Sequence, residues 1–73
     1  MQKTEALQVV KGNTLKVNPL HNLVEPKRRR HLPEIVKVEA AIHYADTATG
    51  VAFLVETLKG SKIWVDASYF DLM

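Results

Sequence analysis

The sequence predicts a small all-β domain whose five or six strands close into a barrel. Residues 34–44 alternate between apolar and other side chains with a period of two, which is typical of a half-buried strand. After residue 44, turn signals recur about every 8 to 12 residues, the spacing expected of small sandwiches and barrels. The chain has 73 residues, which fits one domain spanning 1–73.

The N-terminal segment ALQVVKGNTLKVNP predicts two short strands around a tight turn. The two valines at residues 9–10 precede the turn, and Leu15 and Val17 follow it. Gly12 and Asn13 tolerate the positive φ angles that tight hairpin turns require. We therefore expect a hairpin at the start of the chain.

Residues 19–33 form a different kind of segment, because three prolines punctuate it. Proline cannot donate to a sheet ladder, so the segment is predicted to be one long surface loop. The loop carries four consecutive cations and a histidine, namely Lys27, Arg28, Arg29, Arg30 and His31. The chain's net charge is +2, so the other residues together carry −2.

The next segment, residues 34–44, has one apolar side made of Val36, Val38, Ala40, Ile42 and Tyr44. A helix over 34–45 is the alternative, because Pro33 suits a first helical turn. Four β-branched residues in this segment favour the strand.

The last third of the chain reads as a hairpin followed by a closing strand. VAFLVETL is apolar on both faces, as expected of a central strand, and a tight turn at Gly60 connects it to KIWVD. ASYF predicts a short 3₁₀ turn, the only helical turn expected, and DLM predicts a final edge strand. The last strand of a barrel pairs with the first, so Trp64, Tyr69 and Phe70 are expected to close the core.

WVDASYFDLM resembles the last strand, 3₁₀ turn and closing strand of Src-homology-3 domains. Tyr69 matches the family's tyrosine, Ala67 and Ser68 match its small pair, and Asp66 stands where the family has proline. The hairpin VAFLVETLKGSKIWV also resembles the central hairpin of that family. The resemblance covers roughly residues 35–73 and implies a Src-homology-3-like barrel.

The resemblance carries over little of the family's groove for proline-rich peptides. That groove uses aromatic residues of the first loop, a tryptophan after the second loop, and the proline. Here loop 19–33 has no aromatic residue, the strand after the second loop starts at Val51-Ala52, and only Tyr69 matches. Many Src-homology-3-like barrels of bacterial and viral proteins bind nucleic acid or other proteins instead.

The leading functional hypothesis is a non-catalytic module that contacts nucleic acid or an acidic partner through Lys27, Arg28, Arg29, Arg30 and His31. The planar guanidinium of arginine forms bidentate bonds to phosphate, and cations on a loop release counterions from a nucleic-acid backbone. A solvated loop that only aids solubility is one alternative. Another is pairing with the acidic residues 34–73, which carry −3, or with a second subunit.

A protein-interaction module, such as an adaptor or a small phage-type inhibitor, is the second functional class. It would use Trp64 and Tyr69 together with the acidic C-terminal half. An enzyme built by a homo-oligomer is the third class. No catalytic residue is predicted, because His43 has no partner in sequence and neither Ser61 nor Ser68 lies in a nucleophile elbow.

Composition also bears on metal and cofactor binding, on membrane association and on localisation. The chain has no cysteine, and its three histidines lack the spacing of zinc ligands, so no metal or cofactor is predicted. No stretch of about 18 apolar residues exists, so no membrane partner is predicted. No secretory signal is apparent, which favours the cytoplasm.

Overall fold

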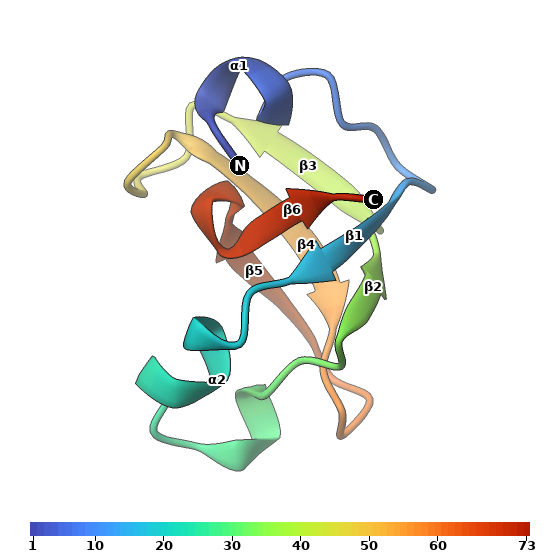
Figure 1. Ribbon diagram of the computed structural model, residues 1–73, viewed down its shortest axis with the longest axis vertical. Helices are drawn as coiled ribbons and strands as arrows, with labels where there is room; N and C mark the ends of the chain where they lie inside the picture. Colours follow the sequence, from blue (N-terminus) through green and yellow to red (C-terminus); the bar gives the residue numbers. More distant parts are fainter.

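The computed structural model covers residues 1–73 and contains six strands in two three-stranded antiparallel sheets (Figure 1). The predicted mainly-β fold is confirmed, but the strands form two separate sheets rather than one closed barrel. In chain order the elements are α1 (Lys3–Ala6), β1 (Thr14–Val17), α2 (Leu20–Val24), the 3₁₀ turn η1 (Arg28–Arg30), β2 (Ile35–Lys37), β3 (Ala40–His43), β4 (Val51–Glu56), β5 (Lys62–Asp66), the 3₁₀ turn η2 (Ala67–Tyr69) and β6 (Phe70–Leu72).

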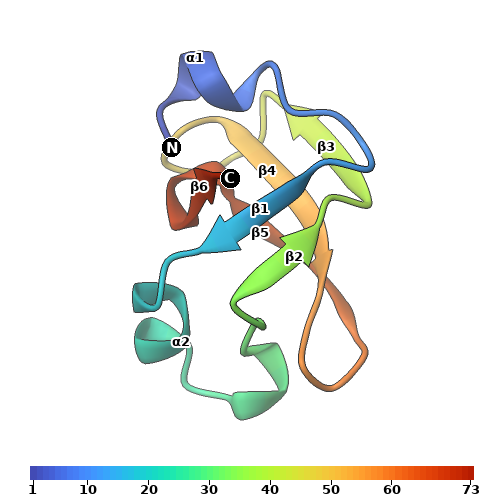
Figure 2. The same cartoon turned by 45° about the vertical axis from the view of Figure 1, so that its right-hand side comes forward.

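Each sheet has one central strand. β1 lies between β2 and β6 in the first sheet, and β4 lies between β3 and β5 in the second (Figure 2). The register of the first sheet aligns Lys16 of β1 with Asp71 of β6. The last strand therefore pairs with the first, as the sequence predicts.

Residues 34–44 are extended rather than helical, but the single predicted strand is two strands, β2 and β3, which belong to different sheets. The Val38 N–H donates to the carbonyl of Asn13 at 2.8 Å, and the Gly12 N–H donates to the Val38 carbonyl at 2.8 Å. The next residue changes sheets, since the Glu39 N–H donates to the Leu54 carbonyl at 2.8 Å. The two consecutive residues between β2 and β3 thus bond to different parts of the fold, Val38 to the turn before β1 and Glu39 to β4.

This break between β2 and β3 shifts the alternation of side chains by one residue. Val36 and Val38 are buried as predicted, but beyond the break Ala41 packs against the core. Ile42 is exposed, and Tyr44 is 98% exposed. The predicted apolar side is therefore correct up to the break and wrong after it, because a period of two holds only within one continuous strand.

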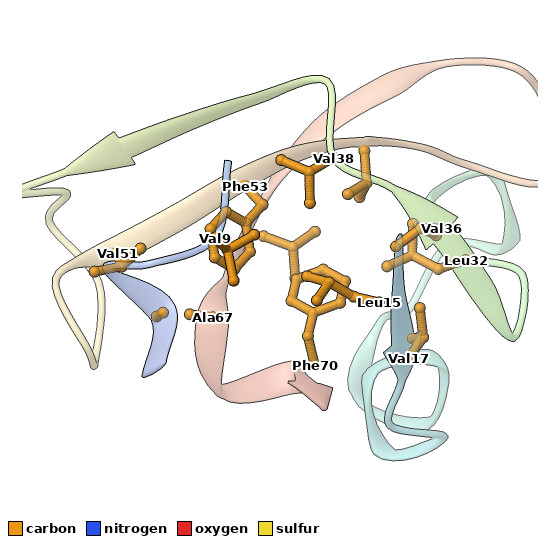
Figure 3. Close-up of a cluster of buried hydrophobic side chains, with 13 residues drawn as sticks. Val9, Leu15, Val17, Leu32, Val36, Val38, Val51, Phe53, Ala67 and Phe70 are labelled. Atoms are coloured by element: carbon orange, nitrogen blue, oxygen red, sulfur yellow. The ribbon is translucent and has the colours of Figure 1, made fainter. Parts of the chain in front are cut away.

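Both sheets contribute to the core, which Figure 3 shows in close-up. The rings of Phe53 and Phe70 lie edge to face with their centroids 5.8 Å apart, and both are fully buried. Trp64 does not close the core, contrary to expectation: it lies on the outward side of β5 and is 42% exposed. The cluster consists of Ala6, Val9, Leu15, Val17, Leu32, Val36, Val38, Val51, Phe53, Val55, Val65, Ala67 and Phe70.

The N-terminal hairpin is absent. Residues 3–6 form α1, and Val9 reaches the core from a loop rather than from a strand. The Asn13 side-chain oxygen accepts the N–H of Val10 at 2.9 Å, and Gly12 bonds to Val38, just after β2. Because Gly12 and Asn13 bond to Val38, the residues on the two sides of this turn do not pair with each other as strands.

Helix is not confined to the predicted 3₁₀ turn at residues 67–70, although that turn is present as η2. The long loop contains α2 and η1 as well. Two prolines mark the limits of α2, since Pro19 precedes its first residue and Pro26 follows its C-cap, Glu25. Proline suits a helix start and disfavours a helical residue before it, so the same prolines that exclude a strand delimit this helix.

Candidate functional site

The long loop lies at one end of the molecule, beside the turn that connects β4 to β5 (Figures 1 and 2). The N–H of Leu58 in that turn donates to the carbonyl of His31 at 2.9 Å. Within the loop, the Asn22 side chain accepts the Leu32 N–H at 2.8 Å and donates to the Leu32 carbonyl at 2.9 Å. These three bonds give the cation-bearing segment a defined position.

The four consecutive cations are not equivalent. Arg30 is half-buried, and its Nε lies 3.0 Å from Oε1 of Glu25, so its charge is compensated within the loop. Lys27, Arg28 and Arg29 are exposed and form no ion pair with a carboxylate. Three of the predicted contact cations are therefore free to meet a ligand.

His31 is also partly engaged by the protein itself. It is half-buried, and its Nε2 lies 3.3 Å from the carbonyl oxygen of Glu25. Glu25 thus holds Arg30 through its side chain and His31 through its backbone. These contacts make Arg30 and His31 parts of the loop's framework.

Lys59 joins the free cations, although the sequence gives no reason to place it there. The β4–β5 turn and the loop enclose an open hollow of about 400 Å³, lined by Arg28, His31, Leu58 and Lys59. No acidic side chain lines this hollow, and Lys59 forms no ion pair. We call Lys27, Arg28, Arg29 and Lys59 the basic end.

The turn that presents Lys59 is tightly built. Gly60 has φ of 85°, a left-handed conformation that favours glycine, and its N–H donates to the Thr57 carbonyl at 3.0 Å. The buried Thr57 hydroxyl accepts the backbone N–H groups of Lys59 and Ser61. The backbone at Lys59 is therefore fixed, while its side chain extends into solvent.

The two aromatic residues proposed for an interaction surface lie beside a second, smaller hollow. Trp64 and Tyr69 both line this space of about 140 Å³ next to α2. The Tyr69 ring packs edge to face on the buried His21, with centroids 5.4 Å apart and planes at 82°. The other lining residues are His21, Val24, Glu25, Arg30, Val65 and Asp66.

Asp66, which stands where the Src-homology-3 family has proline, holds the end of β5 in place. One carboxylate oxygen accepts the Ser68 N–H at 2.9 Å and so caps η2. The other accepts the N–H and the hydroxyl of Thr49 at 3.1 and 2.8 Å. Burial alone would raise the pKa of Asp66, but hydrogen bonds from Ser68, from the Thr47 side chain and from the Thr49 backbone hold this pKa well below its usual value.

We expect Asp66→Asn to destabilise the protein by about 1–3 kcal/mol at neutral pH, because the amide keeps only one acceptor oxygen and leaves the donors of either Thr49 or Ser68 without a partner. Because the folded-state pKa is lowered, the carboxylate's contribution is complete above the unfolded-state pKa of about 4 and is lost as the pH falls further. Thermal melts of both proteins at pH 7 and pH 2.5 should therefore show the stability gap narrowing in acid. Asp46→Asn, an exposed control, should show no gap at either pH; an Asp66 gap that is constant with pH would contradict this assignment.

Apolar side chains are exposed on α2 and after β3. Leu20, Leu23 and Val24 are exposed on α2, and Leu23 is 81% exposed. Tyr44 has φ of 73°, which is uncommon for an aromatic residue and characteristic of strained or functional positions. Sequence reasoning placed Tyr44 inside the strand and so missed this exposed ring.

No three His, Asp or Glu side chains gather in a way that could hold a metal ion. No helix is long and apolar enough to cross a lipid bilayer.

Comparison of this chain with protein-family models, with curated proteins and with solved structures finds no match.

Proposed function

We propose that the protein is a non-catalytic module that binds the phosphate backbone of nucleic acid through its basic end. The observation that carries the proposal is that exposed, unpaired cations from two separate segments, Arg28 and Lys59, line one hollow, with Lys27 and Arg29 next to Arg28 in the chain. Lys27, Arg28 and Arg29 come from the loop and Lys59 from the β4–β5 turn. The Leu58–His31 backbone hydrogen bond joins these two segments.

Electrostatics favour an anionic partner for this arrangement. Neighbouring like charges repel one another and destabilise the free protein, whereas a phosphate backbone neutralises them and releases its own counterions. Arg30 is excluded from the proposed contact set because Glu25 already pairs with it. Aromatic rings that could stack on bases lie elsewhere, on β5, on η2 and at Tyr44 after β3. The proposed contact is therefore to phosphates and is independent of base sequence.

Replacing Arg28 and Arg29 together by alanine should weaken binding to all nucleic-acid sequences to a similar degree. The slope of log K against log salt should fall by at most ~2, one for each phosphate that the variant no longer neutralises. Both side chains are exposed and unpaired, so the melting temperature should stay nearly unchanged. Fluorescence anisotropy with duplex DNA and with RNA, at two salt concentrations, measures the effect.

The matched control is Lys11→Ala/Lys37→Ala, which removes the same charge outside the basic end. A smaller decrease of affinity in this control supports a localised contact; an equal decrease indicates attraction by net charge alone. If the wild-type protein binds neither DNA nor RNA at ~50 mM salt, the proposal fails.

A protein-interaction module is the second candidate, and a specific observation favours it. Leu20, Leu23 and Val24 are exposed on α2, and Val24 also lines the hollow that Trp64 and Tyr69 line. Exposed apolar residues gathered in one region are typical of protein contacts. A complex that survives nuclease and high salt but does not form with Leu23→Ser would favour this candidate over nucleic-acid binding.

We also propose that the fold is a partly open Src-homology-3-like barrel. Its support is the order of the elements: a long loop after β1, a tight turn between β4 and β5, and a 3₁₀ turn before the closing strand. Likeness to that family's strand arrangement in an experimental structure is the test.

A further inference from the structure

The hollow between η1 and the β4–β5 turn differs from the rest of the basic end because its cations face a shared space. Arg28 and His31 line it from the loop, and Leu58 and Lys59 line it from the turn. Its volume of about 400 Å³ gives room for a small anionic group. Lys27 and Arg29 do not line it, although they neighbour Arg28 in sequence.

We propose that this hollow binds a phosphomonoester, the terminal phosphate of a nucleic-acid strand. The identification of the strand rests on the proposed function, whereas the preference for a phosphomonoester rests on the hollow itself. A phosphomonoester carries a charge of about −1.5 to −2 at pH 7 and presents three acceptor oxygens. A phosphodiester inside a strand carries a single negative charge, so it matches two convergent cations less well.

The donors around the hollow suit this chemistry. Arg28 supplies a planar guanidinium able to donate two parallel hydrogen bonds, and Lys59 supplies a compact ammonium. The hollow contains no carboxylate that would compete for these donors. The site thus combines two fixed segments, two uncompensated positive charges and an acid-free lining.

The hollow's walls are held together before any ligand arrives. The Leu58 N–H bonds to the His31 carbonyl at 2.9 Å, so the loop and the turn are joined beside the lining residues. The Thr57 hydroxyl fixes the turn's backbone, and Asn22 fixes Leu32 next to His31. Preorganised walls lower the cost of ordering the site around an anion.

The test compares three oligonucleotides of one sequence, with a 5′-phosphate, a 3′-phosphate or hydroxyl groups at both ends. Wild type should bind at least one phosphorylated strand about tenfold more tightly than the hydroxyl strand, as expected for one added charge-assisted contact. Lys59→Ala should remove this difference. Arg29→Ala, a control that removes one cation of η1 that does not line the hollow, should weaken all three complexes and preserve the difference.

The outcomes separate this inference from the proposed function. Equal affinity for all three strands in the wild-type protein overturns the phosphomonoester site and leaves backbone binding intact. Inorganic phosphate and a phosphoserine peptide serve as further probes, read by the NMR shifts of the amides of His31 and Lys59. If no oligonucleotide binds but these probes shift both amides in the wild-type protein and not in Arg28→Ala, the hollow is supported and nucleic acid is rejected as its partner.

Discussion

Removal of residues 69–73 is expected to unfold the protein. The truncation deletes β6, which pairs with β1 along its length, and removes the fully buried Phe70 from its contact with Phe53. Loss of a buried phenylalanine alone costs about 3–5 kcal/mol, and small domains have only about 5–15 kcal/mol of total stability. Far-UV circular dichroism and a thermal melt should show a chain without a cooperative transition.

Two further variants serve as controls for this truncation. Deleting Met73 alone removes an exposed residue outside β6 and should leave the melting temperature nearly unchanged. Phe70→Leu should fall between the two, because it retains part of the buried apolar volume. A chain lacking residues 69–73 that melts cooperatively at the wild-type temperature would show that the C-terminal strand is dispensable.

Asn22→Ala is expected to impair stability and ligand binding together, although it removes no charge. Its side chain bonds to both the N–H and the carbonyl of Leu32, and Leu32 is buried in the core. Leaving such buried backbone groups without partners costs about 1–3 kcal/mol. The loop should then lose its fixed position, so the cations of the basic end no longer converge.

Thermal melts and the anisotropy titration together test this second expectation. Asn22→Asp, which still accepts the Leu32 N–H but cannot donate to the carbonyl, should show an intermediate loss of stability. The Arg28→Ala/Arg29→Ala variant should differ from Asn22→Ala in stability alone, with weaker binding and an unchanged melting temperature. If Asn22→Ala binds and melts like the wild-type protein, Asn22 does not position the basic end.

Local signals in the sequence account for the elements that were predicted correctly. β4 and β5 are short apolar segments on either side of Gly60, and each of these signals is contained within a few neighbouring residues. The 3₁₀ turn η2 and the closing strand β6 follow from an equally local pattern. These elements form as their local sequence predicts because no contact with a distant segment favours a different structure there.

The mistaken expectations share one cause, namely contacts between residues far apart in the sequence. Val9 and Val10 carry a hairpin signal, but Gly12 bonds to Val38, a residue far along the chain. The alternation after Val38 fails because the next amide bonds to the second sheet. The missing hairpin and the shifted alternation therefore both depend on contacts between residues that are far apart in the sequence.

The candidate site likewise has features that local sequence predicts and features that depend on tertiary contacts. The run of cations and its surface position follow from composition and from the prolines, and this part of the prediction agrees with the exposure of Lys27, Arg28 and Arg29. The compensation of Arg30 by Glu25 and the approach of Lys59 depend on how the loop folds. Trp64 was expected to serve both core and surface, and the register of β5 turns it outward.

The exchange of sheets between Val38 and Glu39 has a consequence for how the molecule comes apart. Only Val38 and Glu39 separate β2 from β3, and Val38 bonds to Gly12 and Asn13 just before β1, whereas Glu39 bonds to Leu54 of β4. A thermal fluctuation that breaks the hydrogen bonds of Val38 also strains those of Glu39, because the two residues are covalently joined. Because this single peptide unit couples the two sheets, we expect them to unfold in one cooperative transition rather than as two separable halves.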